Sequence, residues 1–133
     1  MSNARVLIVD DNPGNLRLAE FVLASYGFNV ATATNAEEAL TAVERVKPAV
    51  IIMDIQLPGM DGLELTRRLK ADPTTRGIAI VAVTAYAMEQ DEVRAREAGC
   101  EDYIAKPIDT RSFAGRIANV LATHEGGSAL RRG

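Results

Sequence analysis

Five polar side chains follow short apolar segments of this 133-residue chain, each at the point where its segment ends. Asp10 and Asp11 follow the first segment, Asp54 and Thr84 follow two later ones, and Lys106 comes after the last. Carboxylates bind hard metal ions, and a carboxylate oxygen can also attack phosphorus and form an acyl phosphate. A hydroxyl and an ammonium group can hold the oxygens of a phosphoryl group. Brought together by the fold, these side chains can carry out metal-assisted phosphoryl transfer.

The charges of these groups predict a bound cation. Three carboxylates and one ammonium group sum to a net charge of −2 when all are ionised. Two like charges about 4 Å apart repel each other by about 4 kcal/mol at an effective dielectric constant of about 20. The carboxylates must therefore take up protons or gather a cation. Because the ligands are all oxygens, we predict a Mg²⁺ ion in the cluster, with Asp54 as the phosphoryl acceptor.

The apolar segments are predicted to be β-strands that alternate with helices. The strands are expected at residues 6–9, 28–33, 49–53, 78–83 and 102–105. The helices are expected at about residues 13–26, 36–46, 61–72, 88–98 and, from Asp109 or Thr110, to about residue 123. Asn12, Asn35 and Asp61 are the predicted caps of the first three helices.

Repeated strand-then-helix order predicts an α/β fold with a parallel sheet and helices on both faces. The length of the chain favours the doubly wound five-stranded sheet of the flavodoxin-like (βα)5 class, whose strand order is 2-1-3-4-5. All strands of such a sheet end at the same edge, so the five polar side chains are expected to converge there. Residues 1–123 would form this single domain, and residues 124–133 a disordered tail or linker.

Two helices carry more specific predictions. The buried stripe of the first helix is expected to contain Asn15, Leu18, Ala19, Val22, Leu23 and Tyr26. The fourth helix is rich in charged residues and, after Met88, has only Val93, Ala95 and Ala98 as apolar anchors. Because little apolar area holds it, this helix should shift or open at a lower free-energy cost than its neighbours.

Composition excludes several other classes of protein. The formal net charge is −3 and the pI is about 5.2, which argues against direct binding of nucleic acid, because such binding depends on Lys and Arg. No apolar run approaches the roughly 18 residues of a membrane span. Cys100 is the only cysteine, which fits a reducing compartment, and we interpret it as a small buried residue. These features predict a soluble cytoplasmic protein.

Four motifs contain the polar residues: VDDN at residues 9–12, MDIQLPGMDG at 53–62, VTA at 83–85 and YIAKP at 103–107. Together they resemble the signatures of two-component response-regulator receiver domains, a CheY-like superfamily. The resemblance covers about residues 5–123. Residues 53–58, with Gly99, Cys100 and Tyr103, also resemble the single-domain cell-division regulators of alphaproteobacteria, and receivers of hybrid kinases share these segments.

The resemblance implies a role for each residue of the pocket. Asp54 would accept a phosphoryl group from a phosphohistidine. Asp11, Asp54 and the backbone carbonyl of Gln56 would bind Mg²⁺, and Asp10 would support the ion through water. Gln56 and Tyr86, each two residues past a pocket residue, occupy positions that tune dephosphorylation in the family.

The resemblance also implies a conformational switch. Lys106 would hold the phosphoryl group, and its peptide bond to Pro107 is cis in the family. Thr84 and Tyr103 would form the switch pair, the hydroxyl moving toward the phosphoryl group while the ring turns inward. Phosphorylation is then expected to bias the fourth helix and the surface around Tyr103, which partners would read.

A receiver is a signalling domain rather than an enzyme, since it catalyses only its own phosphorylation and slow dephosphorylation. The implied partners are a histidine kinase or histidine phosphotransferase upstream and an effector protein downstream. The sequence leaves open whether the chain is a stand-alone protein or an excised receiver of a larger one.

Two other functions use related chemistry. A small magnesium-dependent phosphatase of the haloacid-dehalogenase type has an aspartyl nucleophile after the first strand and a second acid two residues later, whereas Asp10 and Asp11 are adjacent. A flavin carrier needs an uncharged, hydroxyl-rich loop after the first strand, and two carboxylates there would repel its phosphate. The phosphatase is the alternative to a receiver, and the flavin carrier has little support.

Overall fold

The computed structural model describes residues 4–57, 59–85 and 89–132, with side chains described through Thr123. The strands are β1 (Arg5–Val9), β2 (Asn29–Ala33), β3 (Val50–Asp54), β4 (Ala79–Thr84) and β5 (Asp102–Ala105). The helices are α1 (Pro13–Ser25), α2 (Ala36–Val46), α3 (Gly62–Ala71), α4 (Glu89–Ala98) and α5 (Phe113–Arg132). Strands and helices alternate along the chain, as the sequence predicts.

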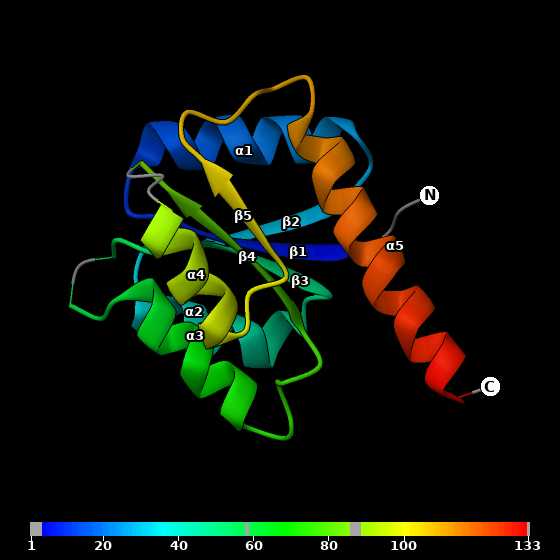
Figure 1. The fold of residues 1–133 in the computed structure, drawn as a ribbon. Helices are drawn as coiled ribbons and strands as arrows, with labels where there is room; N and C mark the ends of the chain where they lie inside the picture. The colour runs from blue at the N-terminus through cyan, green and yellow to red at the C-terminus, as the bar shows by residue number, and fades with distance from the viewer. Residues whose placement is uncertain (1–3, 58, 86–88, 133) are drawn as a thin grey trace.

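All five strands form one parallel sheet in the order β2-β1-β3-β4-β5, which confirms the predicted fold class (Figure 1). Helices α1 and α5 cover one face of the sheet, and α2, α3 and α4 cover the other. The central strands are buried on both sides, which explains their uninterrupted apolar sequences. Among the described helices, none is long and apolar enough to cross a bilayer.

Each face of the sheet has its own hydrophobic core. In β1, Leu7 and Val9 pack beneath α2, α3 and α4, whereas Val6 and Ile8 pack beneath α1 and α5. The same alternation holds in β3 and β4, because successive side chains of a strand point to opposite faces. Aliphatic side chains dominate both cores, in keeping with the low aromatic content of 5%.

The predicted caps hold the starts of three helices. The Asn12 side chain accepts a hydrogen bond from the Asn15 N–H, and the Asn35 side chain accepts one from the Glu38 N–H. Asp61 accepts from Leu63 at the start of α3. In each case a polar side chain satisfies a backbone donor that has no partner within the first turn of the helix.

The predicted buried stripe of α1 is wrong in part. Leu16, Ala19 and Leu23 are the buried residues of this helix, whereas Leu18 is 41% exposed and Tyr26 is 56% exposed. Apolar residues lie around much of α1, so two different stripes satisfy helical periodicity equally well. The choice between them depends on how the helix is rotated against the sheet, which the sequence does not show.

The last helix also differs from its predicted limits. It begins at Phe113, because Asp109 first forms a turn in which its side chain accepts from the Arg111 N–H. It continues to Arg132, beyond the predicted end near Thr123. The division of the chain into a domain ending at residue 123 and a disordered tail stays a prediction.

An ion pair joins three elements at the amino-terminal edge of the sheet. Lys70, near the end of α3, donates to the Ile78 carbonyl at 2.7 Å and lies 3.0 Å from the Glu101 carboxylate. Glu101 in turn accepts from the Ile80 N–H in β4 at 2.7 Å. This Lys70–Glu101 pair therefore connects α3, β4 and the start of β5 on the side away from the acidic residues.

Candidate metal and phosphoryl-transfer site

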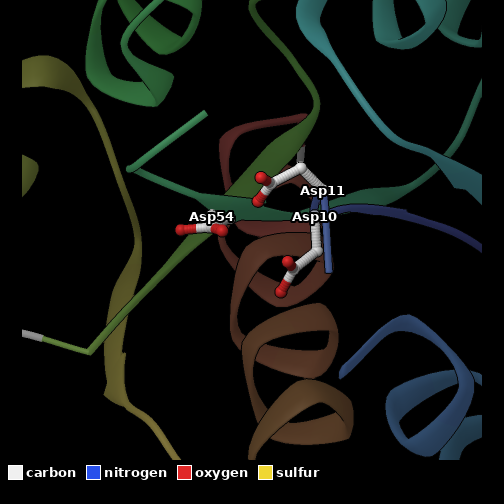
Figure 2. A group of neighbouring side chains, drawn as sticks. All are labelled: Asp10, Asp11 and Asp54. Carbon is white, nitrogen blue, oxygen red and sulfur yellow. The ribbon is translucent and has the colours of Figure 1, made fainter. Parts of the chain in front are cut away.

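The predicted pocket residues lie at the carboxyl-terminal edge of the sheet. Asp10 follows β1, Asp54 and Thr84 are the last residues of β3 and β4, and Lys106 follows β5. The strands β1, β3, β4 and β5 are consecutive neighbours in the sheet, so parallel pairing brings their ends together. Figure 2 shows Asp10, Asp11 and Asp54 grouped at this edge.

Lys106 joins two of the carboxylates. Its Nζ lies 3.0 Å from Asp10 Oδ2 and 3.1 Å from Asp54 Oδ2. The other oxygen of each carboxylate is held by a backbone amide two residues later: the Asn12 N–H donates to Asp10 and the Gln56 N–H donates to Asp54, both at 2.9 Å. Because both carboxylates are held at both oxygens, their orientation is fixed before any ligand arrives.

The three aspartates can hold a cation. Each offers one carboxylate oxygen, and these oxygens all lie within 4.8 Å of one another. Asp10 and Asp54 are buried, whereas Asp11 is exposed and faces the solvent side of the cluster. A small hard ion that keeps several of its waters suits an all-oxygen cluster open on one side. The residues therefore fit Mg²⁺, as the charge of the site predicts.

Burial and charge shift the pKa of two groups. Burial raises the pKa of the Asp54 carboxyl, and hydrogen bonds from Gln56 and Lys106 offset this shift only in part. Burial alone would lower the pKa of the Lys106 ammonium, but its hydrogen bonds to Asp10 and Asp54 outweigh that effect, so its pKa is raised. Lys106 therefore remains a cation at neutral pH, and the ionised form of Asp54 is held at a cost in free energy.

The two residues predicted to form a switch pair, Thr84 and Tyr103, lie in β4 and β5 beside the cluster. Thr84 is fully buried, and its carbonyl accepts a hydrogen bond of 2.8 Å from the Lys106 N–H, which ties the ends of β4 and β5 together. Tyr103 is partly buried and packs against the core beneath α2, α3 and α4. Burial raises the pKa of the Tyr103 hydroxyl, as do the nearby charges of Asp91 and Glu92 on α4.

The fourth helix has the weak anchoring that its sequence predicts. Ala95 and Ala98 are its buried residues, and Val93 is 50% exposed. Two exposed ion pairs, Arg94 with Asp91 and Arg96 with Glu92, lie along its surface. Surface pairs of this kind add at most about 1 kcal/mol each, so α4 is held mainly by two alanines.

Most of the predicted site residues lie where the sequence places them. Asp10, Asp11, Asp54 and Lys106 come together, and the peptide bond between Lys106 and Pro107 is cis. Gln56 is exposed beside Asp54, whereas Tyr86 lies outside the described residues.

Two backbone amides and one glycine contribute to the site in ways that were not predicted from the sequence. The amides of Asn12 and Gln56 orient the two carboxylates, and the signal for them was available, because each lies two residues after an aspartate, the spacing of an Asx-turn. Gly62 packs against the backbone of Asp54, a contact between residues eight positions apart that the sequence did not reveal.

Comparison with known proteins places this site in context. Residues 6–118 match the family described as the response regulator receiver domain. The chain is 43% identical over 116 residues to the polar-differentiation response regulator DivK of Brucella anthropi, covering 87% of this chain and 94% of that protein. It is 39% identical to the response regulator PleD of Caulobacter vibrioides over 118 residues, 89% of this chain and 26% of PleD.

Solved structures agree with the sequence comparisons. The crystal structure of a CheY-like response regulator receiver domain protein from Methanospirillum hungatei is 32% identical and superimposes with a TM-score of 0.86. That alignment covers 95% of this chain and 99% of the other. The similarity in structure therefore extends over nearly the whole chain.

Proposed function

Because this chain belongs to the receiver-domain family of two-component response regulators, we propose that Asp54 is its phosphoacceptor and that the phosphoryl donor is a phosphohistidine. One observation carries the proposal: the Lys106 ammonium lies within 3.1 Å of an Asp54 oxygen, beside a cluster of three aspartates. This arrangement supplies a nucleophile and a fixed positive charge at the same place.

The proposed transfer forms one bond and breaks another. An Asp54 oxygen bonds to phosphorus while the bond between phosphorus and the donor imidazole nitrogen breaks, and the nitrogen keeps the electron pair. Lys106 then changes partner from carboxylate to phosphoryl oxygen, and the Thr84 hydroxyl donates to the same group. Fixed charges and donors that await the reaction lower its barrier because they need no rearrangement.

The proposed metal ligands are Asp11, Asp54 and the backbone carbonyl of Gln56, with Asp10 supporting the ion through water. The grouping of the three carboxylates supports this assignment. A bound Mg²⁺ supplies positive charge that offsets the acidic cluster and the phosphoryl oxygens. Gln56 and Tyr86 are the proposed positions that set the rate of dephosphorylation.

The switch is proposed to run from Thr84 and Tyr103 to α4. Three observations support it: Thr84 lies at the end of β4, the charges of Asp91 and Glu92 on α4 contribute to the raised pKa of the Tyr103 hydroxyl, and α4 is weakly anchored. The upstream partner would be a histidine kinase or histidine phosphotransferase, and the downstream partner an effector protein in the cytoplasm. The signal would pass by protein contact or by transfer of the phosphoryl group.

The alternative function, a magnesium-dependent phosphatase, is not favoured. Its second acid would lie two residues after a nucleophile that follows the first strand, whereas here Asp11 directly follows Asp10, and Lys106 pairs both with Asp10 and with Asp54 at the end of β3. The matching family and relatives are response regulators. Failure to hydrolyse generic phosphate esters in a direct assay is the expected result.

Intact-mass spectrometry tests the acceptor. The protein is incubated with Mg²⁺ and a small phosphodonor, and separately with a phosphorylated histidine phosphotransferase. Wild type and Asp72→Asn are expected to gain one phosphoryl group, whereas Asp54→Asn gains none. Asp72 is an exposed aspartate beyond the end of α3, so it controls for loss of a carboxylate as such. Equal labelling of Asp54→Asn and wild type would refute the assignment.

NMR tests the switch. When a phosphoryl analogue binds with Mg²⁺, amide shifts are expected at the acidic edge and also along α4 and around Tyr103. Shifts confined to the acidic edge would show that α4 does not respond.

A further inference from the structure

Gly62, the first residue of α3, lies against the backbone of the proposed phosphoacceptor. A Cβ atom at this position would sit 2.3 Å from the Asp54 carbonyl oxygen, 2.6 Å from the Ile55 Cα and 3.0 Å from the Asp54 carbonyl carbon. All three are backbone atoms, so no side-chain rotation could relieve the overlap. The helix can approach β3 this closely only because residue 62 has no side chain.

The requirement for glycine here concerns space and not backbone conformation. Among the described glycines, Gly27, Gly59 and Gly99 have positive φ, and Gly62 does not. An alanine at position 62 would therefore suit the helical backbone and would differ from glycine through its contact with residues 54 and 55. This makes the position suitable for a clean test.

Hydrogen bonds hold the same contact in place. The Gly62 N–H donates to the Ile55 carbonyl at 3.1 Å, and the Thr66 hydroxyl donates to the Gly62 carbonyl at 2.9 Å. On the other side, the Ile55 N–H donates to the Val83 carbonyl of β4 at 3.1 Å. The segment from Asp54 to Gln56 is therefore held between α3 and β4.

The short segment 54–56 contains most of the proposed chemistry. It supplies the Asp54 carboxylate, the Gln56 N–H that orients this carboxylate at 2.9 Å, and the Gln56 carbonyl proposed as a metal ligand. A shift of this segment away from α3 would move both proposed ligands relative to Asp11 and Lys106, which follow β1 and β5. Gly62 would therefore not contact the metal or the phosphoryl group itself, but it contacts the backbone of the segment that supplies the proposed ligands.

We propose that Gly62 is a positioning residue of this site: its close contact with the backbone of residues 54 and 55 sets the placement of the Asp54 carboxylate and the Gln56 carbonyl for Mg²⁺. The inference rests on the proposed function, since it assumes that these groups bind the ion. Substitution of residues that orient metal ligands, without binding the metal themselves, commonly weakens metal binding by about 10- to 100-fold. We expect Gly62→Ala to weaken Mg²⁺ binding by about tenfold or more while the protein stays folded.

The test is a Mg²⁺ titration followed by amide NMR shifts, on wild type, Gly62→Ala and the control Gly115→Ala. Gly115 lies in α5, and nothing lies within 4 Å of the Cβ that alanine would add there. Gly115→Ala is expected to bind Mg²⁺ as wild type does. Equal Mg²⁺ affinity in folded Gly62→Ala and wild type would overturn the role of Gly62 and leave Asp54 as the acceptor. Absence of both Mg²⁺ binding and phosphorylation in wild type would instead overturn the proposed function, and this inference with it.

A second measurement needs no variant, and so it also covers the case in which Gly62→Ala does not fold. If the contact and the metal are coupled, Mg²⁺ must strengthen the hydrogen bond from Gly62 to Ile55, because coupling between two sites is reciprocal. Hydrogen exchange of the Gly62 amide in wild type is expected to slow by at least about fivefold on saturation with Mg²⁺, relative to amides in α5. Unchanged exchange at Gly62, with Mg²⁺ bound, would overturn the proposal.

Discussion

Replacement of Asp54 with asparagine removes one negative charge from the acidic cluster while keeping nearly the same shape. An oxygen of Asp54 lies within 4.8 Å of an oxygen of Asp10 and of Asp11. At an effective dielectric constant of about 20, each of these repulsions is worth about 3 to 4 kcal/mol. The opposing attraction to Lys106 Nζ, at 3.1 Å, is worth about 5 kcal/mol on the same scale.

Burial of the charged carboxylate is the main cost of ionising Asp54, and the repulsion by its neighbouring carboxylates adds to that cost against the attraction of Lys106. Solvent around the exposed Asp11 weakens one of the repulsions. We therefore expect Asp54→Asn to be more stable than wild type by about 1 to 2 kcal/mol when Mg²⁺ is removed with EDTA. The raised pKa of Asp54 agrees in sign, because it shows that ionisation of this carboxyl is unfavourable in the folded protein.

Urea unfolding followed by circular dichroism measures the difference. Saturating Mg²⁺ should reverse the order or close the gap, since an ion at about 100 times its Kd stabilises the folded state by about 2.7 kcal/mol. Asp54→Asn lacks one of the three clustered carboxylates and is expected to gain less. Asp72→Asn, outside the cluster, should respond to Mg²⁺ as wild type does. A finding that Asp54→Asn is the less stable protein in EDTA would refute the reasoning, because the attraction of Lys106 would then outweigh burial and the repulsions together.

Three further predictions concern residues outside the acidic cluster. Burial raises the pKa of the Cys100 thiol to about 11, so the free energy of unfolding should fall as the pH rises from about 9 toward 11. In urea titrations over this pH range, wild type should lose on the order of 2 kcal/mol more than Cys100→Ala. An equal loss in the two proteins would contradict the burial argument. Lys70→Met removes the ammonium group that pairs with Glu101 and should lower the free energy of unfolding by about 1 to 3 kcal/mol in the same assay. Arg94→Gln, which breaks an exposed pair, should lower it by less than about 1 kcal/mol. Similar losses in the two variants would show that burial does not decide the strength of these pairs. Asn35→Ala removes the cap of α2 and should cost about 1 kcal/mol, and a neutral result would mean that water replaces the cap.

The sheet could be predicted from the sequence because several of its signals agree. The β-branched strands, the caps at Asn12, Asn35 and Asp61, and the alternation of strands with helices all point to one topology. In a parallel sheet the strand ends meet at one edge, so the order of the elements is enough to bring together residues as far apart in the chain as Asp10 and Lys106. The acidic cluster follows from topology and charge alone.

Features that depend on the packing of whole elements could not be predicted. The buried face of α1 depends on the rotation of the helix, and the sequence offered two apolar stripes, of which Leu16 belongs to the observed one and Leu18 to the other. The contact of Gly62 with Asp54 depends on how closely α3 approaches β3, a distance that no local pattern encodes. The simultaneous pairing of Lys106 with both Asp10 and Asp54 likewise needed atomic positions.

The amino-terminal edge of the sheet contains a pair of opposite charges, whereas the carboxyl-terminal edge contains a cluster of like charges. Lys70 and Glu101 attract each other at one edge, and the aspartates repel one another at the other. Glu101 and Lys106 are five positions apart along the extended chain of β5, a distance of about 16 Å. Sites this far apart usually contribute independently to stability, so the effects of Lys70 and Asp54 substitutions should simply add. Substitutions in the acidic cluster are therefore expected to leave the stability contributed by the Lys70–Glu101 pair unchanged.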